Sequence, residues 1–401
     1  MNLLRIARKN ILYKPLNTAL SLILLAFGVG IISLLLLLEN GLKTEFDRNI
    51  RDIDMVLGAK GSPLQLILAN IYHLDAPTGN ISRQEARRVM KHPYIDKAIP
   101  LAYGDNYRSF RIVGTTHDYP EHYEVALLSG RLWETPFEAT IGSKVAQSSG
   151  LKLGDTFYSA HGLEDETDVH ENNAFTVVGI FAESGSVIDQ LILTPMESIW
   201  NVHAHPEDAA ADSTSLPEDA PEDEITAVLL TKKNPLAIVT IPNLIRDTNM
   251  QVALPAIEIN RLTQNFGIGM KTLSGIAVLI MIISFISVFI SLYNSMKERK
   301  YELALMRSMG ASRSTLFLLI LTEGLWLTVL GTLLGLVMSR VGMWVLSSVM
   351  KDEFKYDIGN MGVLQGEIIL IGLTIFVGVL ASLLPARETV RMDVSKILGD
   401  A

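Results

Sequence analysis

The sequence predicts a membrane protein with four transmembrane helices, arranged as one and then three, and a large extracytoplasmic α+β domain on helical stalks. The 401 residues are 49% hydrophobic yet 19% charged, which is typical of membrane spans joined to a sizeable soluble domain. The charge is also unevenly divided. Residues 39–263 hold 18 Lys and Arg against 33 Asp and Glu, whereas the remaining ends and loops are net basic.

Residues 1–15 place apolar side chains at helical spacing, with Arg and Lys between them. This pattern predicts a cytoplasmic amphipathic helix lying at the membrane interface. Residues 16–38 follow without a charge; at 1.5 Å per residue they make about 34 Å of helix, enough to cross a hydrocarbon core of about 30 Å. A cleaved signal peptide is the alternative, but it has a shorter apolar core followed by small residues, whereas Leu38 runs into Glu39.

Three further spans are predicted at residues 272–293, 316–346 and 368–385, the last closed by Pro385. The third contains Glu323, whose cost the surrounding leucines outweigh. Basic residues dominate the amino terminus and the short segment 294–315. The positive-inside rule places both in the cytoplasm with the tail 386–401, and places residues 39–271 and the short loop 347–367 outside.

The outer segment has signals for both helices and strands. Two helical stalks are expected to continue the spans outward, with apolar positions at Leu42, Phe46 and Ile50 in one and at Ile257, Leu262 and Phe266 in the other. Capping boxes at 82–85 and 194–197 predict helices, the second with Pro195 at its first position. Strands are predicted at 111–114, 155–160, 175–181, 191–194 and 225–230.

Few residues in this chain suggest a catalytic, cofactor-binding or metal-binding site. There is no G-x-x-x-x-G-K-[ST] loop and no G-x-S-x-G or H-E-x-x-H motif, so we expect neither a bound cofactor nor a catalytic residue. His203 and His205, with Glu207 and Asp208, could bind a metal, but they lie in the acidic stretch 203–224, and a solvated loop is the favoured interpretation.

The third span carries a carboxylate and three glycines. Glu323 could couple protons, as intramembrane acids often do, or it could make a helix–helix contact. Gly324, Gly331 and Gly335 are interpreted as positions where helices pack closely.

Residues 298–312, ERKYELALMRSMGAS, together with Glu323-Gly324 and the closing ASLLPAR at 381–387, resemble the FtsX/MacB-type permeases of ABC transporters. Four outer segments also occur in the family's order: 128–131, 141–146, 151–155 and 175–180. Residues 54–80 and 203–224 have no obvious counterpart. We expect no fused ATPase domain, unlike the MacB type, because residues 1–15 already form the amphipathic segment, and the layout is most similar to the LolC/LolE permeases.

The resemblance implies partners and a mechanism. Family members form homodimers or heterodimers and recruit two copies of a cytoplasmic ATPase, which binds the ATP and Mg. The loop between spans two and three holds a coupling helix resting on the ATPase, and the stalks carry motion to the outer domain. The family also has a glutamate at the position of Glu323, which favours a packing role there.

We expect a coupling helix over residues 296–309, with Arg299, Glu302 and Met306 on one face. The candidate coupling residues are Glu298, Arg299, Glu302, Leu303, Met306, Arg307, Gly310 and Ala311. The alternative is that the basic residues only contact lipid headgroups.

The sequence thus indicates the permease subunit of a mechanotransmission-type ABC transporter in a bacterial cytoplasmic membrane. A separate ATPase, a second permease copy or paralogue, membrane lipid and a periplasmic adaptor or carrier are the expected partners, and nucleic acid is not. Work on a lipoprotein, lipid, peptide or drug at the outer face is the favoured task. The alternative is a signalling or scaffold complex that activates or senses an outer partner without transport.

Overall fold

The computed structural model describes residues 6–7, 9–10, 15–160, 169–203, 224–354 and 362–391. The chain divides into two compact units, one formed by residues 1–44 and 264–401 and the other by residues 45–263. We call them the membrane unit and the outer unit. The acidic stretch 204–223 lies outside the described residues, as do the candidate ligands His205, Glu207 and Asp208.

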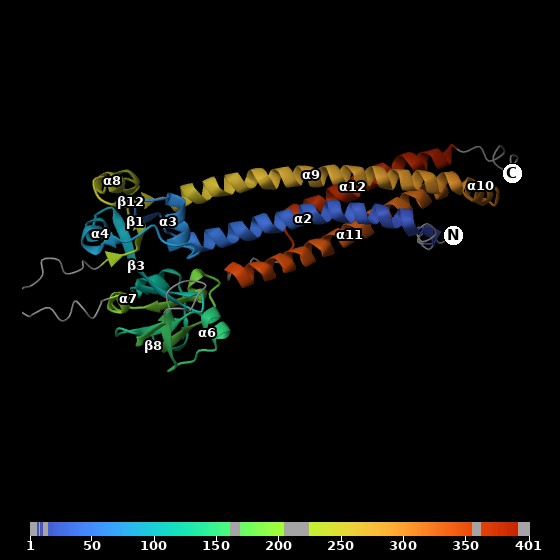
Figure 1. Ribbon diagram of the computed structural model, residues 1–401. Coiled ribbons are helices and arrows are strands. Elements are labelled where there is room, and N and C mark those ends of the chain that lie inside the picture. Colours follow the sequence, from blue (N-terminus) through green and yellow to red (C-terminus); the bar gives the residue numbers. More distant parts are fainter. Residues whose placement is uncertain are drawn as a thin grey trace, which may run out of the picture. The chain divides into compact units, whose positions relative to one another are not determined.

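The described part of the membrane unit contains four helices long and apolar enough to cross a membrane, which confirms the four predicted spans (Figure 1). They are α2 (Pro15–Ile50), α9 (Pro255–Glu298), α11 (Arg313–Phe354) and α12 (Gln365–Val390), and the short helix α10 (Lys300–Ser308) follows α9. Both α2 and α9 run unbroken from apolar span to predicted stalk, and neither segment contains a proline between the two.

Two helices in this unit extend beyond the predicted spans. Helix α12 does not end at Pro385 but continues to Val390. Because proline has no N–H to donate, α12 passes through Pro385 without the hydrogen bond to the Ala381 carbonyl. The carbonyl of Pro385 accepts a hydrogen bond from Thr389 Oγ1 at 3.1 Å. Helix α11 reaches Phe354, so the first part of the predicted loop 347–367 is helical.

The helices of the membrane unit approach most closely where glycines replace larger side chains. A Cβ added to Gly335 of α11 would lie 2.8 Å from Val29 Cβ and 2.9 Å from the Ala26 carbonyl, both on α2. One added to Gly331 would lie 2.6 Å from Leu25. Such contacts let two backbones pack side by side. On another face of α11, Gly324 lies against Ser382 of α12.

The outer unit is built on one mixed sheet of ten strands. Its main path runs β12-β1-β11-β3-β4-β9-β6-β8-β5, and β7 pairs with both β3 and β8. The strands are β1 (Met55–Ala59), β3 (Ile95–Tyr107), β4 (Phe110–Thr115), β5 (Leu127–Gly130), β6 (Glu138–Ile141), β7 (Thr156–Ala160), β8 (Val169–Phe181), β9 (Leu191–Thr194), β11 (Ala227–Lys232) and β12 (Met250–Ala253). The pairs β4–β9 and β6–β8 are parallel, and the other pairs are antiparallel.

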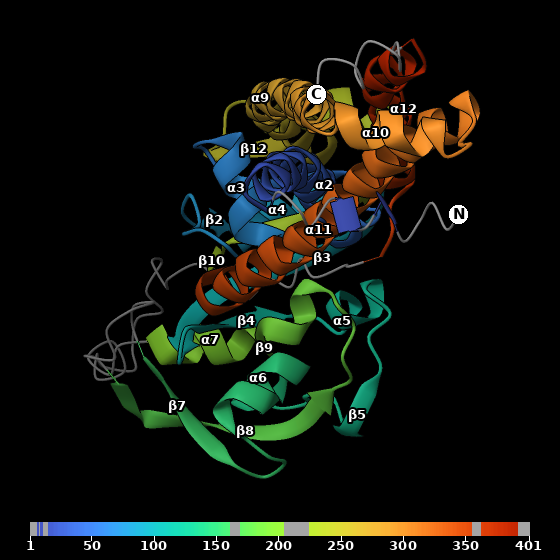
Figure 2. The same cartoon turned by 90° about the vertical axis from the view of Figure 1, so that its right-hand side faces the viewer.

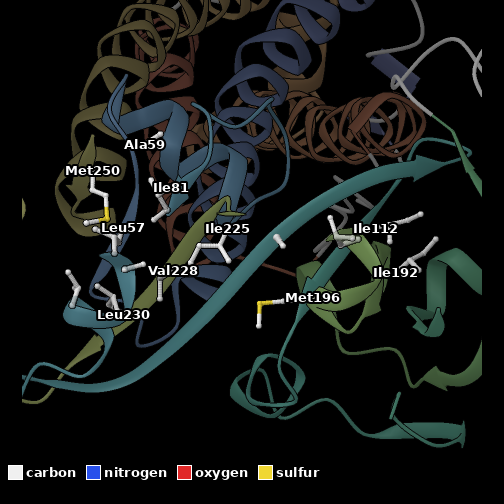
Figure 3. Packing of buried hydrophobic residues seen from close by; sticks show 14 of the residues in the cluster. Leu57, Ala59, Ile81, Ile112, Ile192, Met196, Ile225, Val228, Leu230 and Met250 are labelled. Carbon is white, nitrogen blue, oxygen red and sulfur yellow. The ribbon is translucent and has the colours of Figure 1, made fainter. Parts of the chain in front are cut away.

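Long strand β3 joins the two ends of this sheet, because it pairs with β11 through its first half and with β4 through its second (Figure 2). The covering helices are α3 (Pro63–Asn70), α4 (Arg83–Met90), α5 (Asp118–His122), α6 (Ser143–Ser149), the 3-10 turn η1 (Val187–Gln190), α7 (Met196–His203) and α8 (Ala237–Leu244). A small second sheet pairs β2 (Ile81–Ser82) with β10 (Glu224–Ile225). Buried apolar side chains from both ends of the large sheet form one core (Figure 3).

All five predicted strands are present, β9 with the predicted ends and the others with changed ends, but β1, β3, β5, β6 and β12 of the large sheet were not predicted. β3 contains Pro100 and Gly104, which argue against a strand in sequence. Pro100 is tolerated in the pairing with Val228, and its carbonyl accepts from Thr115 Oγ1 at 2.9 Å.

The two predicted helix caps have different outcomes. Ser82 caps α4 as predicted, because its side chain accepts from the Glu85 N–H. The hydroxyl of Thr194 instead donates to the Glu138 carbonyl and pairs with Ser198 Oγ.

Candidate functional site

The region between α9 and α11 has two sharp turns that set the direction of α10. Helix α9 ends at Glu298, and Arg299 leaves the helical conformation before α10 begins at Lys300, so the predicted continuous helix over 296–309 is wrong. At the other end, Gly310 has φ +98°. The N–H of Gly310 donates to the Arg307 carbonyl and that of Ala311 to the Met306 carbonyl, each at 3.0 Å. This is a Schellman motif, whose left-handed position favours glycine.

One side of α10 is buried against other parts of the membrane unit. Leu303 is 1% exposed and forms an apolar cluster with Ala7, Met296 and Leu316. Met306 packs at its edge. Ala7 belongs to the predicted interfacial helix, of which residues 6, 7, 9 and 10 are described. At this residue the amino-terminal segment contacts protein.

The opposite side of α10 presents an apolar ridge. Tyr301, Leu305 and Met309 follow one another at intervals of four residues and are 51%, 45% and 81% exposed. Intervals of three or four place side chains on one helical face. Glu302 lies beside this ridge with its side chain 61% exposed. These three residues were not predicted from the sequence, although their spacing was available as a signal.

Arg299 does not belong to this exposed face. Its side chain is 11% exposed, and its Nη1 lies 3.3 Å from Oε1 of Glu323 on α11. The same carboxylate oxygen accepts a hydrogen bond from Asn10 Nδ2, and Nε of Arg299 lies 3.1 Å from Glu302 Oε2. Glu323 is 2% exposed, so it faces protein. Three segments therefore meet at one carboxylate, which we call the Glu323 anchor.

A second ion pair joins α11 to α12. Arg340 makes two contacts with Glu367, at 2.7 and 2.8 Å, and Ser33 of α2 donates to the same carboxylate at 2.5 Å. The N–H of Leu364 also donates to it. This pair was not predicted from the sequence. The available signal was Arg340 inside a predicted span, because an intramembrane charge needs a partner.

The end of α2 is fastened to the outer unit, to which residues 45–50 belong. Buried Asn49 accepts from the Val187 N–H at 3.1 Å through Oδ1, and its carbonyl accepts from Tyr123 Oη at 2.9 Å. Nearby, Arg48 Nη1 donates to the Gly185 carbonyl at 2.9 Å. The turn at 184–189 is itself held by Asp189, which accepts from the backbone of Ser184 and Gly185.

The predicted stalk residues fall into different environments. Leu42 packs near Leu37 and Met343 in the membrane unit, and the ring of Phe46 meets that of Tyr72 edge-on with centroids 5.2 Å apart. Ile50 and Leu262 are half-buried, whereas Ile257 is exposed. The side chain of Phe266 lies outside the described part of the structure.

The motif at 128–131 that carried part of the resemblance has a structural role. Gly130 has φ +78°, and a Cβ there would collide with the Val178 carbonyl. Arg131 then pairs with Glu138 through both guanidinium ends, at 2.8 and 2.5 Å. The hydrogen bond from Arg131 lowers the pKa of Glu138 to about 2. The motif therefore stabilises the fold of the outer unit.

A buried histidine lies between two tyrosines in the outer unit. The His73 ring nitrogens lie 2.7 Å from Tyr103 Oη and 2.8 Å from Tyr119 Oη. Burial, reinforced by the charge of Arg111, lowers the pKa of His73 well below its usual range. Tyr103 donates to the Ala69 carbonyl, so Nδ1 of His73 is the donor to Tyr103 and Nε2 accepts from Tyr119.

Among the residues that the structure describes, no group of three or more His, Asp or Glu side chains could hold a metal ion. His203, the last residue of α7, lies at the edge of the described chain. The interpretation of residues 203–208 as a solvated loop rather than a metal site therefore stays a prediction.

These features define a class of protein. The chain belongs to the family of the MacB-like periplasmic core domain, whose profile matches residues 18–230, and the profile of the FtsX-like permease C-terminal region matches residues 274–394. It is therefore an ABC transporter permease of the FtsX/MacB type.

Individual relatives are distant. The chain is 25% identical over 315 residues to an uncharacterized ABC transporter permease protein of Mycobacterium tuberculosis. That match covers 73% of this chain, which spans about a third (33%) of the relative's length.

Two solved structures are also similar. The periplasmic region of MacB from Actinobacillus actinomycetemcomitans has 12% identity and a TM-score of 0.35, and the match covers 53% of this chain and 95% of that one. The extracellular domain of the noncanonic ABC-type transporter YknZ from Gram-positive bacteria has 11% identity and a TM-score of 0.31, with coverages of 50% and 98%.

Proposed function

We propose that this chain is the permease subunit that couples ATP hydrolysis by a separate cytoplasmic ATPase to work at the outer face of the membrane. The observation that carries the proposal is the apolar ridge of Tyr301, Leu305 and Met309 on α10. An exposed apolar ridge on a short helix, with charged neighbours, suits a groove on a partner protein. Helix α10 is also held between two membrane-length helices, so force applied to it reaches both.

The orientation belongs to this proposal. Basic residues near α10 and in the amino-terminal segment favour the cytoplasmic side for both, which puts the outer unit on the other side of the membrane. The chain has no cysteine, so a single introduced cysteine reports one position. We expect Lys152→Cys to react with an impermeant maleimide in intact spheroplasts and Ser308→Cys to react only after lysis. The reverse pattern contradicts the orientation.

In this proposal the outer unit acts on the substrate. Its attachment through Asn49 and Arg48 gives the end of α2 direct hydrogen bonds to the 184–189 turn. A helix fastened in this way transmits a shift rather than absorbing it in a loose linker. We propose that the substrate is amphipathic, such as a lipoprotein, lipid, peptide or drug, and is moved at the outer face without passing through the helices.

The ridge supplies the decisive experiment. Leu305→Asp places a charge on the apolar face, and we expect it to abolish co-purification with the ABC ATPase subunit and the ATP hydrolysis that depends on the complex. The matched control is Leu244→Asp, which changes an equally exposed leucine on α8 of the outer unit. Normal ATPase association by Leu305→Asp would show that α10 is not the docking helix.

A further inference from the structure

The contacts of Glu323 suggest a function that the coupling motif alone does not show. Its carboxylate meets Asn10 from the amino-terminal segment and Arg299 from the junction of α9 and α10. The side chains of Arg299 and Glu323 are 11% and 3% exposed. A buried carboxylate costs free energy unless it is paired and hydrogen-bonded, and here both partners come from segments far from it in sequence.

The apolar surroundings of the anchor join the same segments. Ala7, Leu303 and Leu316 belong to one buried cluster, and they come from the amino-terminal segment, α10 and α11. The polar contact and the apolar cluster therefore fix the same three parts. Because α10 begins directly after Arg299, the ion pair lies at the point where that helix starts.

We propose that Arg299 is a positioning residue that locks α10 and the amino-terminal segment to α11 through Glu323, and that it does not contact the ATPase. The ATPase then meets only the opposite ridge. A push on that ridge moves α10, α11 and the amino-terminal segment as one body. This inference rests on the proposed function for its ATPase partner, whereas the anchor itself can be tested on the chain alone.

The first test measures whether the anchor holds α10 in place. Leu303 and Leu305 lie on the same helix, with exposures of 1% and 45%. In otherwise parental chains we expect Leu305→Cys to react rapidly with a soluble maleimide and Leu303→Cys to react slowly. Adding Glu323→Gln removes the buried charged partner of Arg299 and leaves only the exposed Glu302, so Leu303→Cys should react about tenfold faster while Leu305→Cys is unchanged. An unchanged rate at Leu303→Cys overturns the anchor.

The second test distinguishes positioning from direct contact with the ATPase. Arg299→Gln, Glu323→Gln and the double variant form a cycle, measured as ATP hydrolysis by the complex with its ABC ATPase subunit. If the two residues act only through each other, the double variant is no worse than the worse single variant. If Arg299 binds the ATPase and Glu323 only packs, the two losses multiply, and the positioning role is overturned.

The controls separate this inference from the proposed function. Lys300→Gln removes a neighbouring positive charge that is exposed, and it should retain parental hydrolysis and parental labelling at Leu303→Cys. If Lys300→Gln loses as much ATP hydrolysis as Arg299→Gln does, the specific role of Arg299 is overturned. If the parental chain does not support ATP hydrolysis, the proposed function fails, and the labelling experiment still decides whether Glu323 anchors α10.

Discussion

Arg340 of α11 and Glu367 of α12 form a two-point ion pair between helices that cross the membrane, with N–O distances of 2.7 and 2.8 Å. The Glu367 side chain is 1% exposed, and that of Arg340 is 25% exposed. Two parallel contacts to one carboxylate fix both the distance and the angle between the two helices. Ser33 extends the contact to α2.

Removing one member of this pair should destabilise the chain more than removing both. We expect Glu367→Gln to lower the free energy of unfolding by about 3 kcal/mol, because Arg340 loses its charged partner. The double variant Arg340→Met with Glu367→Gln should recover most of that loss, because no unpaired charge remains. Thermal unfolding of the full chain in detergent measures all three. Additive losses would show that the two residues do not act as a pair.

Hydropathy and charge were sufficient to predict the four membrane helices. The contacts of α10 were not predictable, because they depend on where a helix breaks. A continuous helix over 296–309 puts Arg299, Glu302 and Met306 on one face, but the break at Arg299 turns that residue toward Glu323. Glu323 has two partners, Arg299 at 24 residues and Asn10 at 313 residues along the chain. No local sequence pattern can show contacts at these separations.

The outer sheet shows the same limit. Strands β7 and β9 were predicted because they are short apolar or alternating runs between turns. β3 was missed because Pro100 normally excludes a strand, and its two halves pair with different neighbours. Its existence depends on partners from both ends of the domain, so only the tertiary structure reveals it.

Gly310 should be required for the direction of α10. Its φ of +98° lies in the left-handed region, and open space surrounds it, so Gly310→Val changes backbone conformation without a clash. We expect a loss of about 1–2 kcal/mol in local stability. ATP hydrolysis by the complex should fall strongly, although the variant still inserts into the membrane.

A matched glycine provides the control for Gly310. Gly150 follows α6 in the outer unit with φ +77° and also has open space around it. Gly150→Val should cause similar strain while leaving ATPase association unchanged. If both variants reduce hydrolysis equally, the effect of Gly310→Val reflects general instability and not the direction of α10.

The outer unit should lose stability in mild acid because of His73. Burial lowers its pKa, so the folded chain keeps the ring neutral while the unfolded chain takes up a proton below about pH 6.5. Stability is therefore full above pH 6.5 and decreases as pH falls below it. His122 adds to the same effect, because burial lowers its pKa too.

The slope of unfolding free energy against pH measures this effect. Each histidine that stays neutral contributes at most about 1.4 kcal/mol per pH unit. His73→Gln should reduce the slope between pH 6.5 and 5, and His73→Gln with His122→Gln should reduce it further. A slope for His73→Gln equal to that of the parent would mean that His73 is protonated in the folded chain.

Asn49 should be the residue that fastens the end of α2 to the outer unit. Its side chain accepts from the Val187 N–H at 3.1 Å and donates to the Glu45 carbonyl at 3.1 Å. Asn49→Ala leaves the buried Val187 N–H without a partner, which costs about 1–3 kcal/mol. Hydrogen exchange should then speed up at residues 184–190, because Asn49 holds that turn against the helix.

A second asparagine makes the same local bond without burial, and so provides the control for Asn49. Asn243 Nδ2 donates to the Val239 carbonyl four residues earlier at 3.0 Å, on an exposed part of α8. Asn243→Ala should change stability by less than about 0.5 kcal/mol, as surface substitutions usually do. If Asn49→Ala is equally mild and exchange at 184–190 stays slow, the attachment depends on Arg48 and Tyr123 instead. If exchange quickens, ATP hydrolysis should continue in the complex while work at the outer face is lost, because only the outer end of α2 has been released.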